Sequence, residues 1–275
     1  SGDLVTVRDA VMTGQLDQYA TEIGLWQGIF EKYGIDLQTT EFVAGINTID
    51  AVVNGTADIG MMADYAAVNR LGNTLDATNL QIFSQISGGQ SALSGGLYVD
   101  PKYADDPKSL DGSAGFMYQE GTVTYYYASK CIEYLGLDES KQNLINTDSS
   151  QTRLALIQKG GASAVYANGS EAKYIEEAGW VQVATSQEIG IQTGSYFLST
   201  DKYISENTDT LAKFLQAVDE STQYINDHLD ESAEYLADKL GLKAEDFKEN
   251  WKNYSFEPGF SEKATTHLEL SLIHI

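Results

Sequence analysis

The chain has 275 residues, 42% of them hydrophobic, and carries a formal net charge of −23 at pH 7. Its length suffices to bury one large core or two medium ones, and its apolar content argues against a disordered chain. The strong acidity and the presence of only three arginines argue against nucleic acid or an anionic membrane surface as the partner.

Two further features of the composition narrow the class of protein. Cys131 is the only cysteine, so the chain forms no intrachain disulfide and holds no thiol-rich metal site. No apolar run reaches the length of a transmembrane helix. The sequence opens at Ser1-Gly2-Asp3 without a basic and apolar leader, so we expect any export signal to have been removed.

Strands and helices alternate regularly over the first ninety residues. Apolar residues recur every three or four positions over 16–30, as on one face of a helix, and residues 35–42 alternate as in a strand. The pattern adds helices at 46–54 and 63–71, and strands at 4–8, 58–62 and 80–86. This alternation predicts a parallel sheet covered by helices.

The same alternation resumes after Asp111-Gly112. It predicts helices at 122–135, 150–159 and 170–178, and strands at 114–118, 143–146, 163–166 and 180–184. After Ser199 the chain is almost wholly helical, with amphipathic faces that suit helices packed on the first lobe. Residues 268–275 fit this pattern poorly, and a terminal strand, a docking segment and a non-native extension all stay open.

One phrase of the sequence occurs twice. The segment AVVNGTADIG at 51–60 is echoed by LIQKGGASAV at 156–165. Each copy is the apolar end of a helix, a glycine, a small-polar turn and a strand of small or apolar residues, and Gly55 and Gly160 suit the left-handed position that ends a helix. Two such units predict two similar lobes that hold a ligand between them.

Two extended, apolar segments bounded by glycine, 94–100 and 194–199, are the predicted crossings between the lobes. The expected fold is therefore α/β, with two doubly wound lobes joined by a two-strand hinge and the C-terminal helices packed on lobe one. Lobe one is expected to contain residues 1–92 and 198–275, and lobe two residues 93–197, including the hinge strands.

Enzyme chemistry finds little support in the sequence. The three histidines all lie in the C-terminal helical part or tail, and no nucleophile elbow, zinc-binding helix or phosphate-binding loop is present. Among forty acidic residues, any single pair of carboxylates carries little information. We expect no catalytic residue, metal or cofactor; a carboxylate-based enzyme on the same fold is the alternative.

Ligands of open α/β sheets bind at the carboxyl ends of the strands, where helix starts offer free backbone N–H groups. Gly121-Thr122 is the most specific of these turns, although a capped helix start without a ligand explains it equally well. A solvated loop or a helix N-terminal charge likewise explains Asp64 or Glu171. The candidate ligand-binding residues are Met12, Thr13, Phe42, Asp64, Tyr65, Glu120, Gly121, Thr122, Tyr125, Asn168, Glu171 and Tyr196.

The order of several motifs resembles the extracytoplasmic solute-binding proteins that deliver sulfonates, nitrate and thiamine-pyrimidine precursors to ABC importers. The resemblance extends to about residue 240 and rests on GIFEKYGIDL at 28–37, GTADIG at 55–60, SLDG at 109–112, Gly121-Thr122 and GGASA at 160–164. The iron-dependent pyrimidine synthases of this family need a cysteine/histidine set that is missing from this chain. Regulatory domains of this fold need an attached helix-turn-helix, and we expect none in this protein.

The resemblance implies a periplasmic-binding-protein-like Venus-flytrap of type II, a monomer whose lobes close on a small solute and then dock on an ABC permease. It implies an extracytoplasmic location, periplasmic or lipid-anchored at the outer face of the cell membrane. None of the candidate turns contains lysine or arginine, so Asp64, Glu120 and Glu171 with nearby tyrosines favour an amine-bearing or heteroaromatic, pyrimidine-like solute. A sulfonate- or taurine-like anion is the alternative, and a signalling receptor of the same fold also stays open.

Overall fold

The structure, a computed structural model, describes residues 3–42, 45–63, 79–89, 95–120, 123–191, 193–252 and 254–259. The chain divides into two compact units. Among the described residues, unit 1 is formed by those up to Gly88 and from Gly194 to Gly259, and unit 2 by those from Gly89 to Thr193.

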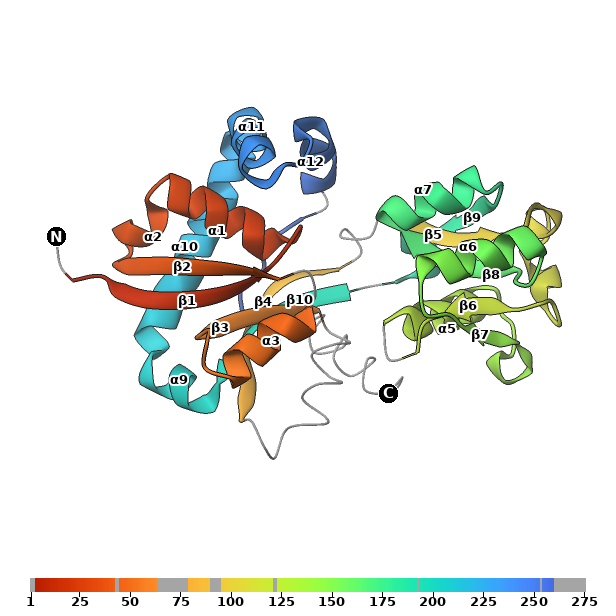
Figure 1. Ribbon diagram of the computed structural model, residues 1–275, viewed down its shortest axis with the longest axis horizontal. Helices are drawn as coiled ribbons and strands as arrows, with labels where there is room; N and C mark the ends of the chain where they lie inside the picture. The colour runs from red at the N-terminus through yellow and green to blue at the C-terminus, as the bar shows by residue number, and fades with distance from the viewer. Residues whose placement is uncertain are drawn as a thin grey trace. The chain divides into compact units, whose positions relative to one another are not determined.

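Unit 1 is built on a five-stranded sheet with the order β2-β1-β3-β10-β4 (Figure 1). Its strands are β1 (Val5–Met12), β2 (Ile35–Phe42), β3 (Ile59–Ala63), β4 (Leu80–Gly89) and β10 (Thr193–Thr200). Strand β1 pairs in parallel with β2 and β3, and β10 pairs antiparallel with β3, the central strand. The mixed sheet therefore keeps a parallel half, where the carboxyl ends of β1, β2 and β3 share one edge.

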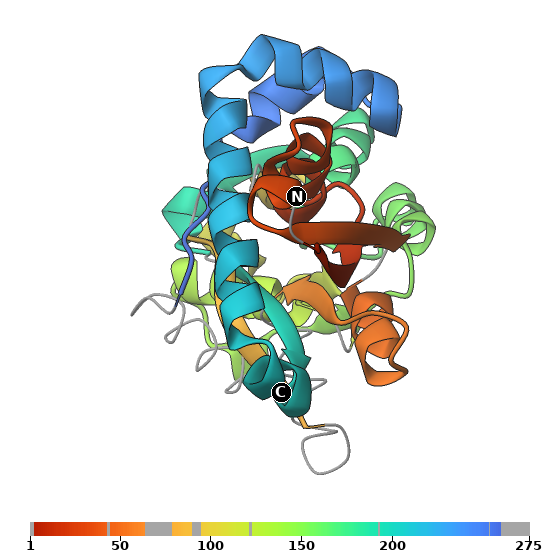
Figure 2. The ribbon, with the colours of Figure 1, turned by 90° about the vertical axis from the view of Figure 1, so that its left-hand side faces the viewer.

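Helices cover both faces of this sheet. They are α1 (Leu16–Trp26), α2 (Ile29–Lys32), α3 (Gly45–Val53), α9 (Asp201–Glu206), α10 (Thr208–Asp227), α11 (Leu229–Leu240) and α12 (Ala244–Trp251). On one face, Ile23 of α1 and Phe214 of α10 share a buried core with Phe197, whereas Ile49 of α3 packs with Leu198 on the other. Figure 2 shows the long α10 helix running beside α1, which confirms that C-terminal helices pack on the first unit.

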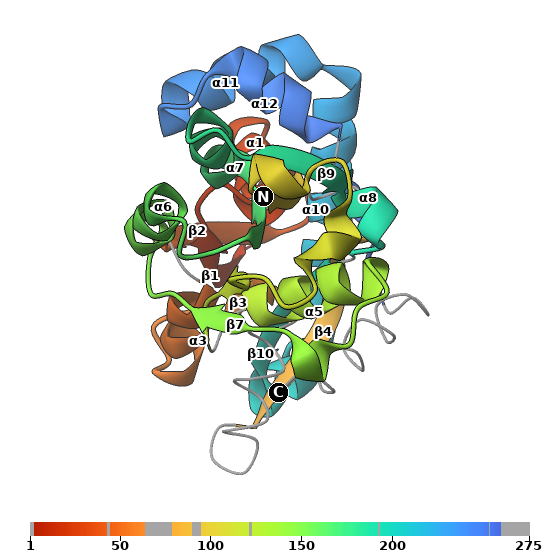
Figure 3. The same cartoon turned by 90° about the vertical axis from the view of Figure 1, so that its right-hand side faces the viewer.

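Unit 2 repeats this architecture with a sheet of order β7-β6-β8-β5-β9 (Figure 1), and its helices α5 to α8 are labelled in Figure 3. Its strands are β5 (Gly95–Val99), β6 (Phe116–Tyr118), β7 (Leu144–Asn146), β8 (Ala164–Asn168) and β9 (Val181–Thr185). Its helices are α5 (Thr124–Tyr134), α6 (Ser150–Lys159), α7 (Gly169–Glu177) and α8 (Ser186–Ile189), with short 3₁₀ turns η2 (Pro101–Tyr103), η3 (Pro107–Leu110) and η4 (Glu139–Lys141). Ile132 of α5 packs on one face of the sheet and Ile175 of α7 on the other, as in a doubly wound fold.

The repeated phrase falls on equivalent elements of the two units. In unit 1 it covers the end of α3 and the start of β3, and in unit 2 the end of α6 and the start of β8. Gly55 and Gly160 have φ angles of +70° and +65°, the left-handed conformation that the sequence predicted. Because the strand orders also correspond, the prediction of two similar α/β units is confirmed.

The boundaries of the units differ from the expected ones. Residues 93–197 were expected to form lobe two, but Ser195 to Leu198 pair with β3, so this segment belongs to the sheet of unit 1. The other predicted crossing strand, β5, pairs with β8 and β9 within unit 2. The predicted helix at 63–71, apart from its first residue, and the tail 268–275 lie outside the described residues.

Candidate functional site

The richest set of polar side chains lies at the carboxyl ends of β6, β7 and β8 and in the turns that follow them. We call this region the unit 2 edge. Parallel strands end there side by side, since β6 pairs in parallel with both β7 and β8. It is the edge at which open α/β sheets bind their ligands.

The turn after β6 is closed by a threonine that the sequence did not single out. The backbone N–H of Gln119 donates to Thr124 Oγ1 over 2.7 Å, and that hydroxyl lies 3.2 Å from the Gln119 carbonyl. Helix α5 begins at Thr124, two residues later than predicted, and Val123 precedes it without a side-chain capping bond. Gly121 and Thr122 lie outside the described residues.

Glu120 is held by the end of the neighbouring strand. The side-chain carbonyl of Asn146 accepts the Glu120 N–H at 2.9 Å, and the Asn146 amide donates to Glu120 Oε2 at 3.1 Å. The two bonds fix the Glu120 carboxylate at the unit 2 edge and leave it exposed to solvent. Glu120 stays a predicted ligand contact, and its partner Asn146 was not among the candidates.

A buried arginine lies behind the edge. Arg153, on the first turns of α6, donates from Nε to Thr147 Oγ1 at 2.9 Å and from Nη1 to Glu171 Oε1 at 2.5 Å. Thr147 in turn donates to the carbonyl of Tyr118 at 2.7 Å. The Arg153 side chain is 6% exposed, whereas that of Glu171, in the first turn of α7, is 23% exposed. The network therefore ties the end of β6 to both helices that follow the strands.

Sequence reasoning missed Arg153 because it considered only the turns. No candidate turn contains lysine or arginine, but the guanidinium reaches the edge from inside the neighbouring helix. One feature of the sequence could have indicated Arg153. The chain has only three arginines, and this one stands near the start of the helix that follows the predicted strand at 143–146.

Of the three consecutive tyrosines, Tyr125 is the one that reaches the unit 2 edge. Its ring packs edge-on against Tyr118, with centroids 5.3 Å apart, and its hydroxyl donates to Glu139 Oε1 at 2.9 Å. That hydrogen bond, more than burial, raises the Tyr125 pKa. Tyr126 and Tyr127 are buried in the core of unit 2. The edge thus carries a half-exposed aromatic pair.

The equivalent edge of unit 1 ends in a turn of backbone donors. The Thr13 N–H donates to the Phe42 carbonyl at 2.8 Å, which joins the ends of β1 and β2. The Met12 N–H donates to Asp17 Oδ2 at 3.0 Å, and the Gly14 N–H to Gln18 Oε1 at 2.7 Å. These bonds fix the turn and leave Thr13 exposed.

The remaining candidates are Tyr196, Asn168, Asp64 and Tyr65, and of these Asn168 lies at the unit 2 edge. Tyr196 lies in β10 beside Met62 and is 0% exposed, and a Cβ added at Gly194 would lie 2.6 Å from its hydroxyl. Its ring therefore packs inside unit 1. Asn168 ends β8 and precedes α7 without a side-chain capping bond. Asp64 and Tyr65 lie outside the described residues.

Two carboxyl groups are buried beneath the unit 1 turn. Neither oxygen of Asp9 has a hydrogen-bond partner in the part of the chain that the structure describes. Burial raises the pKa of Asp9 well above its usual range, and Asp17 raises it further. Burial likewise raises the pKa of Asp17 to about 7, although the Met12 N–H opposes the shift.

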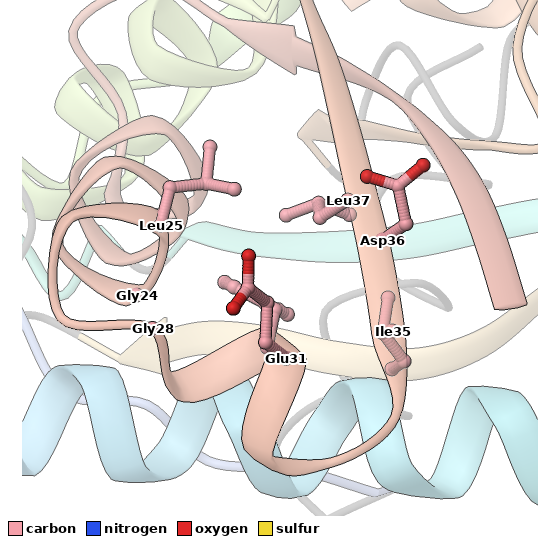
Figure 4. Close-up of a pocket in the computed structure, with 8 residues that line it drawn as sticks. Gly24, Leu25, Gly28, Glu31, Ile35, Asp36 and Leu37 are labelled. Carbon is pink, nitrogen blue, oxygen red and sulfur yellow. The ribbon is translucent and has the colours of Figure 1, made fainter. Parts of the chain in front are cut away.

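Two hollows of unit 1 lie away from these edges. The one in Figure 4 opens beside Ile35, at the start of β2, and is small, with a volume of about 30 Å³. An open hollow of about 290 Å³ lies between α10 and the start of α2, lined by Gln27, Ile29, Glu220, Gln223, Tyr224, Asp227 and His228.

Among the described residues, no group of three or more His, Cys, Asp and Glu side chains is placed to hold a metal ion. Nor does any described helix combine the length and apolarity needed to cross a membrane.

The architecture is that of the periplasmic binding proteins. The aliphatic sulphonate-binding protein SsuA of Escherichia coli matches with a TM-score of 0.78 at 16% identity, over 99% of this chain and 87% of that one. The nitrate-binding protein NrtA of Synechocystis matches with a TM-score of 0.65 at 15% identity, over 99% and 81%. The desulfurization enzyme DSZB, at 0.68 and 12%, shares the fold over 98% and 91%.

The sequence itself identifies the family. The NMT1/THI5-like family model matches residues 23–232, so the chain belongs to that family. No curated protein matches the chain. The expected resemblance to solute-binding proteins of this type is thus confirmed.

Proposed function

We propose that the protein is the solute-binding receptor of an ABC importer and that turns of both units contact one small organic solute. The family match carries this proposal, and the periplasmic binding proteins among the structural neighbours support it. Receptors of this kind act outside the cytoplasm as monomers and pass the solute to a membrane permease. We include in the proposal the location outside the cytoplasm, the monomeric state, the permease partner and an anchoring lipid.

The proposed contacts are the candidates that the sequence predicts in the turns of each unit. In unit 1 they are Met12, Thr13 and Phe42, with Asp64 and Tyr65; in unit 2 they are Glu120, Gly121, Thr122, Tyr125, Asn168 and Glu171. Tyr196, whose ring is fully buried in this structure, completes the proposed set.

We propose an amine-bearing or heteroaromatic solute. Glu120 and Glu171 place two carboxylates at the unit 2 edge against one guanidinium, which belongs to a side chain with almost no exposed surface. The Tyr118–Tyr125 pair adds an aromatic surface suited to a planar ring. A cationic or ring-bearing solute complements both features.

A sulfonate-like anion is the second candidate. The E. coli and Xanthomonas axonopodis neighbours are named as sulphonate- and alkanesulfonate-binding proteins. Arg153 is a cation close to the unit 2 edge. An anion could bind there only by competing with Glu171 for the guanidinium, which makes it the weaker choice.

A panel of solutes tests the proposal. Melting temperatures are measured with 4-amino-5-aminomethylpyrimidine, its 5-hydroxymethyl analogue and ethanesulfonate at equal concentration, and Kd values follow by calorimetry. A shift with the pyrimidines supports the proposed solute, and a shift with ethanesulfonate alone contradicts it. Mass analysis of the recovered ligand separates the receptor from a carboxylate-based enzyme, because a receptor returns the ligand unchanged.

A further inference from the structure

The guanidinium of Arg153 is a feature that the fold does not demand. Thr48 precedes Gly55 by the same number of residues as Arg153 precedes Gly160, so the two occupy equivalent places in α3 and α6. In unit 1 this place is filled by a buried hydroxyl that donates to the Met61 carbonyl at 2.5 Å. The same topology therefore forms without an arginine there.

A buried cation needs hydrogen-bonding or charged partners, because removing the charge from water costs more free energy than packing of the side chain gains. Arg153 has two, the Thr147 hydroxyl and the Glu171 carboxylate. The planar fork of a guanidinium suits such a bridge, whereas a lysine ammonium is a point charge on a flexible stem. The bridge fixes Glu171 relative to the end of β6, since Thr147 is bonded to the Tyr118 carbonyl.

Glu171 is the solvent-facing member of this network. It stands in the first turn of α7, where the helix dipole favours a carboxylate, and its side chain is more exposed than that of Arg153. A solute at the edge would meet the carboxylate and not the guanidinium.

We infer that Arg153 is a positioning residue that holds Glu171 for recognition of the cationic group of the solute, an ammonium or protonated amine. The inference rests on the proposed receptor function and gives the charge of its solute. Glu171 makes the contact, and Arg153 sets where the carboxylate stands.

The test compares two probes that differ only in the cation, 4-amino-5-aminomethylpyrimidine and its 5-hydroxymethyl analogue. General damage to the fold weakens both probes alike, so the ratio of their Kd values isolates recognition of the ammonium. We expect the wild type to prefer the aminomethyl probe at least about tenfold, which corresponds to about 1.4 kcal/mol. Glu171→Gln should bring the ratio to about one.

Arg153→Gln should lower the preference at least about threefold, and Arg153→Lys should restore part of it. Arg8→Gln is the matched control, because the Arg8 side chain donates to the Asp58 carboxylate and to the Gly55 carbonyl, both in unit 1. It should leave the ratio unchanged.

Three results would overturn the inference: equal weakening of both probes by Arg153→Gln, a wild-type preference for ethanesulfonate, or binding of neither pyrimidine. The receptor function is judged separately, by whether any compound is retained from a metabolite extract. Retention of an anion would leave the receptor standing while removing the inference.

Discussion

Replacing Asp9 with leucine is expected to stabilise the protein. Asp9 is 1% exposed, in mid-strand in β1, and neither of its oxygens has a hydrogen-bond partner among the described residues. Strand pairing identifies the equivalent position in unit 2. Asp9 pairs with Ile59 on β3, and Phe116 pairs with Ala164 on β8, the strand of unit 2 that corresponds to β3. Unit 2 thus fills the equivalent position with a buried aromatic ring.

The pH dependence follows from proton linkage. A carboxyl whose pKa is raised in the folded protein contributes most below its unfolded pKa, and the contribution is lost as the pH rises through the folded pKa. For Asp17, with a folded pKa of about 7 against the usual value of 3.8, the loss is about 3 kcal/mol between pH 4 and pH 7. The pKa of Asp9 moves in the same direction for the same reason, burial.

Asp9→Leu should therefore raise the free energy of unfolding by roughly 1–3 kcal/mol at pH 7, the cost of a buried polar group without a hydrogen-bond partner, and by clearly less at pH 4. Urea denaturation of both proteins from pH 4 to pH 8 measures the difference. Asp105→Leu, at an exposed aspartate, is the control and should give a difference that does not depend on pH. A difference between Asp9→Leu and wild type that stays constant across this range would refute the reasoning.

Three other properties follow from the packing. Gly160→Ala forces a residue with a side chain to φ +65° and should cost about 1 kcal/mol in urea denaturation, although a Cβ there meets nothing; no change would refute the strain. Gly96→Ala should cost about 3 kcal/mol or prevent folding, because its Cβ would overlap the Ala184 carbonyl, and a stable variant would contradict the tight strand spacing. Burial raises the pKa of the Cys131 thiol, so Ellman's reagent should titrate it only in denaturant; reaction in the native protein would contradict its burial.

The architecture could be predicted because it depends on local patterns. The two glycine-centred phrases end helices and start buried strands, and both requirements are written into consecutive residues. Strand β2 and helix α6 have the bounds that periodicity predicted. The division between the units was placed a few residues off, because the partner of β10 is set by long-range pairing with β3.

The candidate site was less predictable, since its contacts join segments distant in sequence. Glu120 and Tyr125 follow a strand and could be found as turn residues. The Arg153 bridge joins α6 to α7, and nothing local shows that an arginine inside a helix reaches a carboxylate eighteen positions away. Tyr196 illustrates the opposite case: it follows a glycine turn, but its ring is folded into the core.

The central claim, that the protein is a receptor for a small solute, is tested most directly by capture. Ligand-stripped protein is incubated with a metabolite extract, washed and denatured, and the released compounds are identified by mass spectrometry against an Arg8→Gln control and a blank. We predict one enriched compound, in about equimolar amount, with an amine or heteroaromatic ring and an unaltered mass. Retention of no compound, or release of a chemically altered one, would contradict the account.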